Sequence, residues 1–368
     1  MMIDRRLIQH FDWWLLILTL ALIGVGVVTI YSAAEPGARG MGQIFAVKQA
    51  VWGALGLVLM AAVFSFHYQA LDRWVWGIYA LTVLSLAWVL VFGKTVSGSQ
   101  RWIAIGSFAF QPSEMAKLTA VIVLAHFLSR AGTARGLGFR DILAPAALLS
   151  VPFGLIVIQP DLGTGMVIMI IAASMVLFAG LKRRVLVILV LCALLSGPTL
   201  YVNLKDYQKE RIKTFFNPDR DPLGAGYHII QSKIAIGSGM FSGKGYLKGS
   251  QKALSFLPEQ HTDFIFAVLA EEWGLLGSTA LLVLLFAFLA RGLGAGYRSK
   301  DPFGAFLCVG AASYFFWQIF INMGMVMGIL PVVGVPLPFI SYGGSSMLAA
   351  MTGVGIFLNV GMRRFSYE

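Results

Sequence analysis

Apolar runs long enough to cross a bilayer alternate with short polar segments along this sequence. An α-helix needs about 20 apolar residues to span the hydrocarbon core. Runs of roughly that length begin near ten positions, which are Trp13, Ile44, Trp74, Pro112, Ile142, Gly163, Val185, Thr262, Phe303 and Ser341. The pattern predicts an all-α polytopic membrane protein with about ten transmembrane helices, in a single membrane domain over residues 1–368.

Three of these runs have unusual lengths. Residues 112–128 and 142–158 are short, so we expect helices that are tilted or that lie beside a polar cavity. Residues 13–34 are too long for the apolar core of a signal peptide, which has about 7–15 residues. We expect this run to be retained as the first helix, although residues 32–34 resemble a cleavage site.

Composition agrees with a membrane location. Apolar residues make up 58% of the chain and charged residues only 12%, about half the charged share of a soluble protein. This balance excludes a soluble enzyme, a disordered chain, a fibrous repeat and a disulfide scaffold. Cys192 and Cys308 both lie inside apolar runs. The sequence also lacks a Walker A loop, a dinucleotide fingerprint, a G-x-S-x-G elbow and zinc-ligand spacing.

The net charge of +11 is informative through its distribution. One set of loops carries 14 Lys and Arg residues, whereas the short loops on the other side carry only Arg39, Lys94 and Arg101. Basic residues collect on the cytoplasmic side of membrane proteins, so both termini are predicted to be cytoplasmic. The basic excess is therefore a sign of topology among membrane lipids, and we expect no nucleic-acid partner.

A long loop, residues 204–261, separates the seventh and eighth predicted helices on the extracytoplasmic side. It holds nine basic and five acidic residues. Long loops are translocated regardless of charge, so this one does not disturb the predicted topology. Residues 227–236 are apolar and helix-compatible, and the glycine-rich residues 237–239 follow them. We expect a folded loop with a helix in the membrane interface.

Charged residues inside a membrane span are costly, so each one is a functional hypothesis. Glu114 and Lys117 follow Gln111, Pro112 and Ser113 at the outer start of the fourth helix. Since they are three residues apart, they share a helix face and can pair. Two interpretations stay open, a structural ion pair or a pair that lines a polar cavity and orients a substrate.

Two further acidic positions lie at outer helix starts. Asp161 either caps the sixth helix or contacts an ion or a sugar in a cavity. Asp263 falls in the first turn of the eighth helix, where the helix dipole favours its anionic form. It is either an ordinary helix-start acid or a proton acceptor, and His261 is equally ambiguous. Glu271 and Glu272, about two turns further on, belong either to the cavity or to a solvated surface.

Residues 328–346 are apolar but interrupted by Pro331, Pro336 and Pro338. Such a segment cannot be a continuous helix, and non-helical backbone at membrane depth is tolerated only where protein or a water-filled cavity covers it. We expect a re-entrant segment that borders a pocket before the tenth helix. All four polar clusters fall on the outer side of the predicted topology.

Five stretches together resemble the SEDS family (shape, elongation, division and sporulation). They are Gln-Pro-Ser-Glu at 111–114, Gln-Pro-Asp-Leu-Gly-Thr at 159–164, Gly-Lys-Gly at 243–245, His-Thr-Asp-Phe-Ile-Phe-Ala at 261–267 and Pro-Phe-Ile-Ser-Tyr-Gly-Gly-Ser at 338–345. They occur in the family's order, and the similarity covers essentially the whole chain. Residues 243–251 and 257–263 resemble the elongation branch, RodA, rather than the division branch, FtsW.

The resemblance implies a peptidoglycan glycosyltransferase that polymerises lipid II for cell elongation and rod shape. It implies a multi-pass protein of the bacterial cytoplasmic membrane, with ten transmembrane helices and its active site on the extracytoplasmic side. It also implies a complex with a class B penicillin-binding protein, the transpeptidase, within the elongation machinery. Asp263 is implied as the catalytic acidic residue, with Glu114 and Lys117 in the same cavity.

This activity suggests a mechanism. The partners are lipid II and the growing lipid-linked glycan strand. The donor is an α-linked glycosyl diphosphate on a polyprenyl chain, and the product is a β-1,4 glycan, so an inverting displacement needs one base and a stabilised leaving group. We expect Asp263 to accept the proton of the acceptor 4-hydroxyl. Candidates to neutralise undecaprenyl diphosphate are Lys48, Arg101, Lys244 and a divalent cation, Mg or Mn, at Asp161. Further cavity candidates are Gln111, Ser113, His261, Thr262, Ser341 and Ser345.

Two other classes of function remain open from the sequence. A lipid II flippase or other transporter also uses polar residues at membrane depth and broken helices, but it needs polar groups that reach both faces. A non-catalytic scaffold for the penicillin-binding protein predicts that substitutions of Asp263 leave both chemistry and cell shape unaffected.

Overall fold

A computed structural model of the chain describes residues 9–34, 40–96, 99–105, 108–131, 136–204, 206–220, 225–249 and 261–363. Ten long helices lie in these ranges, one at each predicted run. They are α2 (Trp13–Ala34), α3 (Met41–Ser65), α5 (Val75–Phe92), α6 (Pro112–Arg130), α7 (Phe139–Ile158), α8 (Leu162–Ala179), α9 (Arg183–Asn203), α13 (Ile265–Tyr297), α14 (Pro302–Val326) and α15 (Gly344–Met362). The prediction of an all-α polytopic membrane fold is confirmed.

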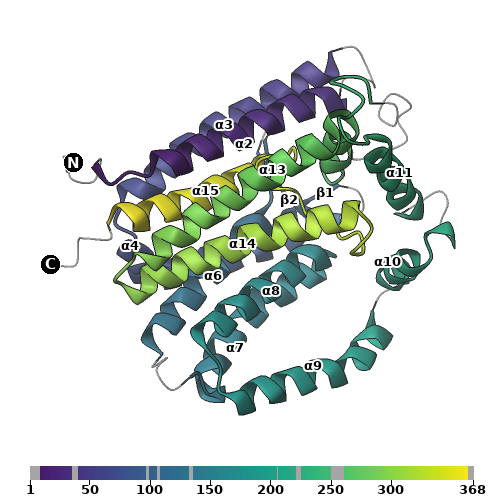
Figure 1. Cartoon of the computed structure of the whole chain (residues 1–368). Helices are drawn as coiled ribbons and strands as arrows, with labels where there is room; N and C mark the ends of the chain where they lie inside the picture. The colour runs from purple at the N-terminus through teal and green to yellow at the C-terminus, as the bar shows by residue number, and fades with distance from the viewer. Residues whose placement is uncertain are drawn as a thin grey trace.

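Eight of these helices are long and apolar enough to cross a membrane by themselves. The other two predicted spans coincide with α6 and α9. Helix α6 carries Glu114 and Lys117 and is buried along most of its length. Helix α9 is the opposite case, because Val185 is its only buried side chain among those described. In Figure 1 it lies apart from most of the other long helices, in agreement with the exposure of its apolar side chains.

Several predicted boundaries were wrong by a few residues. The runs at 112–128 and 142–158 are not short, since α6 has 19 residues and α7 has 20. Helix α13 begins at Ile265 rather than near Thr262, and α15 begins at Gly344 rather than near Ser341. The last two differences matter for function because both displaced starts lie beside candidate site residues.

The chain between α5 and α6 forms a small antiparallel sheet that the hydropathy pattern did not predict. Strands β1 (Lys94–Val96), β2 (Ser99–Ile105) and β3 (Phe108–Phe110) lie in the order β1-β2-β3. Residue pairs such as Ile103 with Phe110 place β-favouring side chains opposite one another. The sheet ends at Phe110, and Gln111 and the first turn of α6 follow directly.

Helices α6, α14 and α15 form the centre of the bundle, where α14 packs against α6, α8, α13 and α15. Small residues allow the close approach, as expected for helices that pack in a membrane. A Cβ atom on Gly355 of α15 would lie 2.8 Å from the Cβ atom of Val63 on α3. The centre is fixed further by the aromatic rings of Phe288, Phe315 and Phe357, with centroids 4.9 to 6.0 Å apart.

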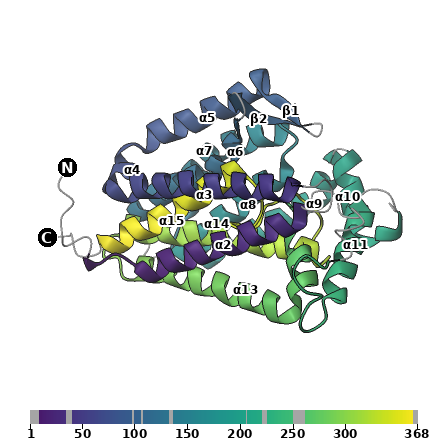
Figure 2. The same cartoon turned by 90° about the horizontal axis from the view of Figure 1, so that it is seen from above.

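The two ends of the bundle differ in character (Figures 1 and 2). The start of α2, the end of α15 and the short helix α4 (Gln69–Arg73) lie at one end, and the small sheet lies at the other. Also at that second end are α10 (Asp206–Phe216), the 3-10 turn η2 (Pro218–Arg220) and α11 (Ala225–Ser238). The prediction of a helix over 227–236 is confirmed by α11. Its Ser232 is buried and donates a hydrogen bond of 2.8 Å to the carbonyl of Val326 at the end of α14.

Residues 328–343 follow α14 without forming a helix, as the prolines predicted. The backbone turns at Gly328 and Gly334, with φ of 71° and 72°. Phe339 is buried, and its ring stacks on Phe315 with centroids 5.5 Å apart. Helix α2 passes so close that a Cβ atom on Gly26 would clash with the carbonyl oxygen of Phe339. Near Phe339 this irregular backbone is therefore covered by protein, as expected at membrane depth, whereas Ile329 and Gly334 are exposed.

Helix α13 is interrupted at Gly274, whose φ of 64° and ψ of −157° are not helical. The chain after α11 packs into the interruption. The amides of Leu275 and Leu276 donate hydrogen bonds to the carbonyls of Met240 and Phe241, at 3.0 and 3.1 Å. A side chain at residue 274 would clash with this loop, which explains the glycine.

Candidate active site

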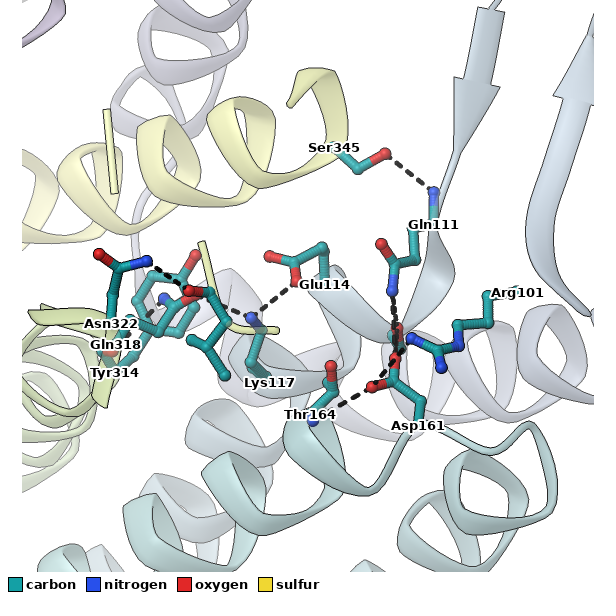
Figure 3. A network of polar contacts seen from close by, with 12 residues as sticks. Arg101, Gln111, Glu114, Lys117, Asp161, Thr164, Tyr314, Gln318, Asn322 and Ser345 are labelled. Atoms are coloured by element: carbon teal, nitrogen blue, oxygen red, sulfur yellow. Dashed lines mark hydrogen bonds and ion pairs between the residues drawn. The ribbon is translucent and has the colours of Figure 1, made fainter. Parts of the chain in front are cut away.

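Lys117 and Glu114 form the buried ion pair that their spacing predicted. Pro112 occupies the first turn of α6, and the pair lies on the face directed at α14. The Lys117 Nζ atom is 2.8 Å from Glu114 Oε1 and 2.9 Å from Gln318 Oε1 on α14 (Figure 3). The two charged side chains are only 1% and 4% exposed. Since burial of charge is costly without a partner, the pair and the amide stabilise each other.

The second carboxylate oxygen of Glu114 has a different environment. Oε2 is buried and makes no hydrogen bond to any of the described residues. A buried carboxylate oxygen normally accepts hydrogen bonds, so this atom is able to accept one from a bound molecule. The pair is therefore a structural element with one unused acceptor, and both earlier interpretations of it remain compatible.

Asp161 sits at the junction of α6, α8 and β2. Its Oδ1 atom accepts a hydrogen bond of 3.3 Å from the Thr164 amide, so the predicted cap of the sixth helix is confirmed. The carboxylate is also 3.6 Å from Arg101 Nη1, 3.2 Å from Gln111 Nε2 and 3.5 Å from Ser113 Oγ. Asp161 and Ser113 are buried, whereas the Arg101 side chain is 28% exposed.

Ser345 connects this cluster to the last helix. Its Oγ atom accepts a hydrogen bond of 2.8 Å from the backbone amide of Gln111, as Figure 3 shows. Gln111 stands immediately before α6, and Ser345 lies in the first turn of α15. The N-terminal ends of three helices, α6, α8 and α15, are thus joined through Gln111.

Asp263 lies in a turn before α13 and not in its first turn, which corrects the prediction. The turn covers residues 261–264, and Phe264 is the residue that precedes the helix. The Asp263 side chain is half-buried. A Cβ atom built on Gly334 would lie 3.2 Å from Asp263 Oδ2, so the carboxylate is next to that glycine.

The turn is held from two sides by other parts of the chain. Ser341 Oγ donates a hydrogen bond of 2.7 Å to the carbonyl of Thr262, and the Tyr342 amide donates one of 2.9 Å to the carbonyl of His261. On the other side, Asn322 Nδ2 donates to the carbonyl of Asp263 at 3.0 Å. These bonds replace the helical bonds that residues 261–264 would otherwise make.

Helix α3 borders the same turn. The His261 ring lies 4.7 Å from the ring of Phe45, centroid to centroid. Lys48, one turn along α3, is exposed, and its Nζ atom lies 5.9 Å from the centroid of the Phe45 ring. Gln49 Nε2 donates to the carbonyl of Ser341 at 3.1 Å. The predicted residues His261, Thr262, Asp263 and Ser341 are thus brought together, with Lys48 at their edge.

Gln318 and Asn322 are the functional candidates that sequence reasoning missed. Both have 0% exposure and lie one turn apart on α14. Gln318 accepts a hydrogen bond from Lys117, and Asn322 donates one to the backbone carbonyl of Asp263. Two amides on one face in the middle of an apolar run are a signal that could have identified them, because such groups need partners inside the bundle.

Lys244 is placed differently from the other predicted cations. Its Nζ atom is 2.7 Å from Glu271 Oε1, and Glu271 is only 1% exposed. Glu272 is 2% exposed and accepts a hydrogen bond of 2.5 Å from Ser32 on α2. Of the two alternatives left open for these glutamates, the solvated surface is excluded by their burial. Glu271 binds the loop that contains Lys244, and Glu272 binds helix α2, close to the interruption of α13 at Gly274.

The residues around Asp161 do not fit the divalent cation considered from the sequence. Arg101, Gln111 and the Thr164 amide present hydrogen-bond donors to the carboxylate, whereas Mg²⁺ requires several oxygen ligands. Across the part of the chain that the structure describes, no group of three or more His, Cys, Asp or Glu side chains is arranged to hold a metal. A Mg or Mn ion at this site remains an untested expectation.

Comparison with known proteins gives a consistent result. The family model FTSW_RODA_SPOVE, described as a cell cycle protein, matches residues 13–365. The peptidoglycan glycosyltransferase MrdB of Escherichia coli K12 is 40% identical, with 96% of this chain and 94% of that protein covered. The peptidoglycan glycosyltransferase RodA of Treponema pallidum is 32% identical, with 98% and 99% covered.

Two solved structures agree with the sequence relatives. A chain from a peptidoglycan synthase complex that coordinates polymerization and crosslinking has a TM-score of 0.82 and 32% identity, with 96% of this chain and 98% of that chain covered. RodA of Thermus thermophilus, the rod shape determining protein, has a TM-score of 0.70 and 29% identity with the same coverage. The chain belongs to the FtsW, RodA and SpoVE family of cell cycle proteins, which is the SEDS family that its motifs resemble.

Proposed function

We propose that this chain polymerises lipid II by an inverting glycosyl transfer in which Asp263 is the base. The activity class is that of a peptidoglycan glycosyltransferase, because the chain shares 40% identity with such an enzyme over nearly the whole length of both proteins. One observation carries the assignment of the base. Asp263 is half-buried in a turn that Asn322 and Ser341 fix in place, beside Gly334 and one helix away from the Glu114–Lys117 pair.

The proposed step forms one bond and breaks one. The acceptor 4-hydroxyl oxygen attacks the anomeric carbon of the donor, its proton moves to the Asp263 carboxylate, and the bond between that carbon and the diphosphate oxygen breaks. The electron pair leaves with undecaprenyl diphosphate. General-base assistance of this kind contributes typically 10²–10⁴-fold to a rate, so loss of the carboxylate is expected to be severe.

The leaving diphosphate needs positive charge. The candidate cations differ in whether they already pair with a carboxylate of the protein. Lys117 is buried between Glu114 and Gln318, and Lys244 is paired with Glu271. Lys48 is exposed and makes no ion pair within the described ranges. It borders the Asp263 turn through Phe45 and His261. Lys48, with a contribution from the partly exposed Arg101, is therefore the best-supported diphosphate contact.

We assign the site to the extracytoplasmic side of the cytoplasmic membrane. Two observations support this orientation: the described loops rich in basic residues lie at the end of the bundle where α2 starts and α15 ends, and the Asp263 turn follows the loop that includes α10 and α11 at the opposite end. A class B penicillin-binding protein is the proposed partner. The related chain in the peptidoglycan synthase complex, which covers 96% of this chain, supports that assignment.

Polymerisation by the purified chain tests the proposal. Wild-type protein in detergent, given lipid II with and without the transpeptidase partner, should release undecaprenyl diphosphate and form glycan strands. Asp263→Asn should lower the rate by at least about 10²-fold while the melting temperature stays close to that of the wild type. Asp141→Asn, a change in an exposed carboxylate near the opposite end of the bundle, is the matched control and should retain activity.

Other outcomes identify the alternative functions. Strand formation by Asp263→Asn at the wild-type rate would remove Asp263 from the role of base. Movement of lipid II across a vesicle membrane without any polymer would indicate a flippase. Full transpeptidase activity of the complex with no glycan synthesis by either variant or wild type would indicate a scaffold.

A further inference from the structure

We propose that Asn322 is a positioning residue that sets the location of the Asp263 carboxylate. The inference deepens the proposed function and depends on Asp263 being the base. It is carried by a single amide group that connects the two stretches of backbone between which the carboxylate lies.

Both hydrogens of the Asn322 amide are used. Nδ2 donates to the carbonyl of Asp263 at 3.0 Å and to the carbonyl of Val335 at 2.8 Å. Carbonyl oxygens only accept hydrogen bonds, so this pair of partners also fixes which side-chain atom is the nitrogen. Asp263 lies 59 residues before Asn322 in the sequence and Val335 lies 13 residues after it. The amide therefore adds a third connection between two segments that Ser341 and Tyr342 also join, and it is the one that reaches Asp263 and Val335 themselves.

The second segment is also the surface next to the carboxylate. Val335 directly follows Gly334, and Gly334 is the residue whose added Cβ atom would lie 3.2 Å from Asp263 Oδ2. If the bond to Val335 were lost, Gly334 and its left-handed backbone, with φ of 72°, would be free to move relative to Asp263. Asn322 thus acts on the Asp263 carboxylate in two ways. It bonds the backbone of Asp263 itself, and it bonds Val335, which follows the neighbouring Gly334.

Asn322 is also linked to the buried charges. Gln318, one turn earlier on α14, accepts the hydrogen bond of Lys117. One face of one helix therefore determines where the proposed base and the Glu114–Lys117 pair lie relative to each other. Catalytic groups must be held close to their productive geometry, and a displacement of about 1 Å can reduce a rate by roughly 10²-fold.

A merely structural role of Asn322 makes a different prediction from a positioning role. Asn322 is fully buried, so Asn322→Ala should leave two carbonyls without donors and create a cavity. Asn322→Leu removes the same donors but fills most of the volume. If the residue only stabilises the fold, the activity of the two variants should follow their stability. If it positions Asp263, both should lose the same activity, although their melting temperatures differ.

The chain offers a matched control in Asn359 on α15. Asn359 is 1% exposed, and its Nδ2 atom donates to two carbonyls, those of Val63 and Phe66, both at 2.7 Å. Its Nδ2 atom bonds two carbonyls as that of Asn322 does, and its Oδ1 atom also accepts a hydrogen bond from Arg363. These partners lie near α4, away from the Asp263 turn. Asn359→Leu should lower the melting temperature to a similar degree without affecting the kcat of folded protein.

The experiment measures kcat and KM for lipid II with purified full-length variants. For Asn322→Leu and Asn322→Ala we expect kcat to fall about 10²-fold while KM stays within about threefold of the wild type, since the amide contacts no substrate in this proposal. Equal kcat in Asn322→Leu and wild type would overturn the inference. An equal loss in Asn359→Leu would overturn it as well, because the effect would then belong to stability.

Failure of the inference and failure of the proposed function are distinguishable. If wild type is active, Asp263→Asn is inactive and Asn322→Leu is fully active, only the positioning role is rejected. If Asp263→Asn keeps its activity, the base is another group, and the positioning role is rejected together with it.

Discussion

At the scale of single residues, Lys117 shows how a charge is accommodated in the centre of a membrane bundle. Its ammonium group is bonded to a carboxylate and to an amide, and the Tyr314 ring lies 5.5 Å from it. The sequence predicted the Glu114 contact, because the two residues share a helix face. It did not predict Gln318, which is 201 residues away in the chain. Partners within one turn follow from helical periodicity, whereas partners on another helix follow only from packing.

A double-mutant comparison tests the Glu114–Lys117 pair. Glu114→Gln or Lys117→Met alone leaves one buried charge uncompensated and should destabilise the protein by about 3–5 kcal/mol. The double variant Glu114→Gln/Lys117→Met removes both charges and should have a higher melting temperature than either single variant. Thermal unfolding in detergent measures this order. A double variant less stable than both single variants would contradict it.

The activity of the same double variant separates the two interpretations of the pair. A folded double variant that still polymerises lipid II would show that the pair is purely structural. Loss of polymerisation in a folded double variant would instead place the charges in the substrate cavity, as the unused Glu114 Oε2 acceptor favours.

At the scale of secondary structure, hydropathy located every long helix but could not place the starts that matter most. The segment 261–264 has the composition of a helix start, yet Ser341, Tyr342 and Asn322 bond its carbonyls and keep it out of α13. Those donors come from parts of the chain that a local pattern does not contain. The three-residue strands β1 and β3 were missed for another reason, because a window of helix length averages over them.

The short helix α4 gives a prediction at this scale, since it is tied to α6 by one carboxylate. Asp72 Oδ2 is 2.6 Å from Arg130 Nη2, and Asp72 Oδ1 is 2.8 Å from His126 Nδ1. The hydrogen bond from Arg130 lowers the pKa of Asp72 below its ordinary value. A lowered carboxylate pKa stabilises the folded state above the unfolded pKa of about 4, and this contribution is lost as the pH falls through the folded value.

Arg130→Gln should therefore destabilise the protein near pH 7 and have little effect well below pH 4. Because Arg130 is 53% exposed, the difference is expected to be about 1 kcal/mol or less. Melting temperatures of wild type and variant between pH 3 and 7 measure it. Lys213→Gln, which removes an exposed ion pair to Glu210 of 3.5 Å, is the control. If the difference in melting temperature between Arg130→Gln and wild type does not become smaller at acidic pH, the role of Asp72 is contradicted.

At the scale of the whole molecule, the sequence predicted that the polar clusters lie on the same side of the membrane. It did not predict which contacts connect one cluster to another. Topology alone grouped Asp161, Asp263 and residues 328–346, because each follows or precedes a helix on the same side. That α14 should lie between the Asp263 turn and Lys117 depends on its packing against α6 and α13, which small residues and aromatic rings determine far from the site. The sequence therefore predicted which residues would lie around the Asp263 turn and Asp161, but it predicted neither Gln318 and Asn322 nor the hydrogen bonds that connect them to Lys117 and Asp263.

The orientation of the bundle in the membrane provides the last prediction, and the proposed function depends on it. Glu210 on α10 is exposed and lies at the end with the small sheet, whereas Lys300, between α13 and α14, is exposed at the end where α2 starts and α15 ends. In a Cys192→Ser background, which removes an exposed thiol, a membrane-impermeant maleimide added to intact bacteria should label Glu210→Cys. It should label Lys300→Cys only after permeabilisation, because basic residues mark the cytoplasmic side. The reverse pattern would place Asp263 at the cytoplasmic face, where it could not build a strand outside the cell.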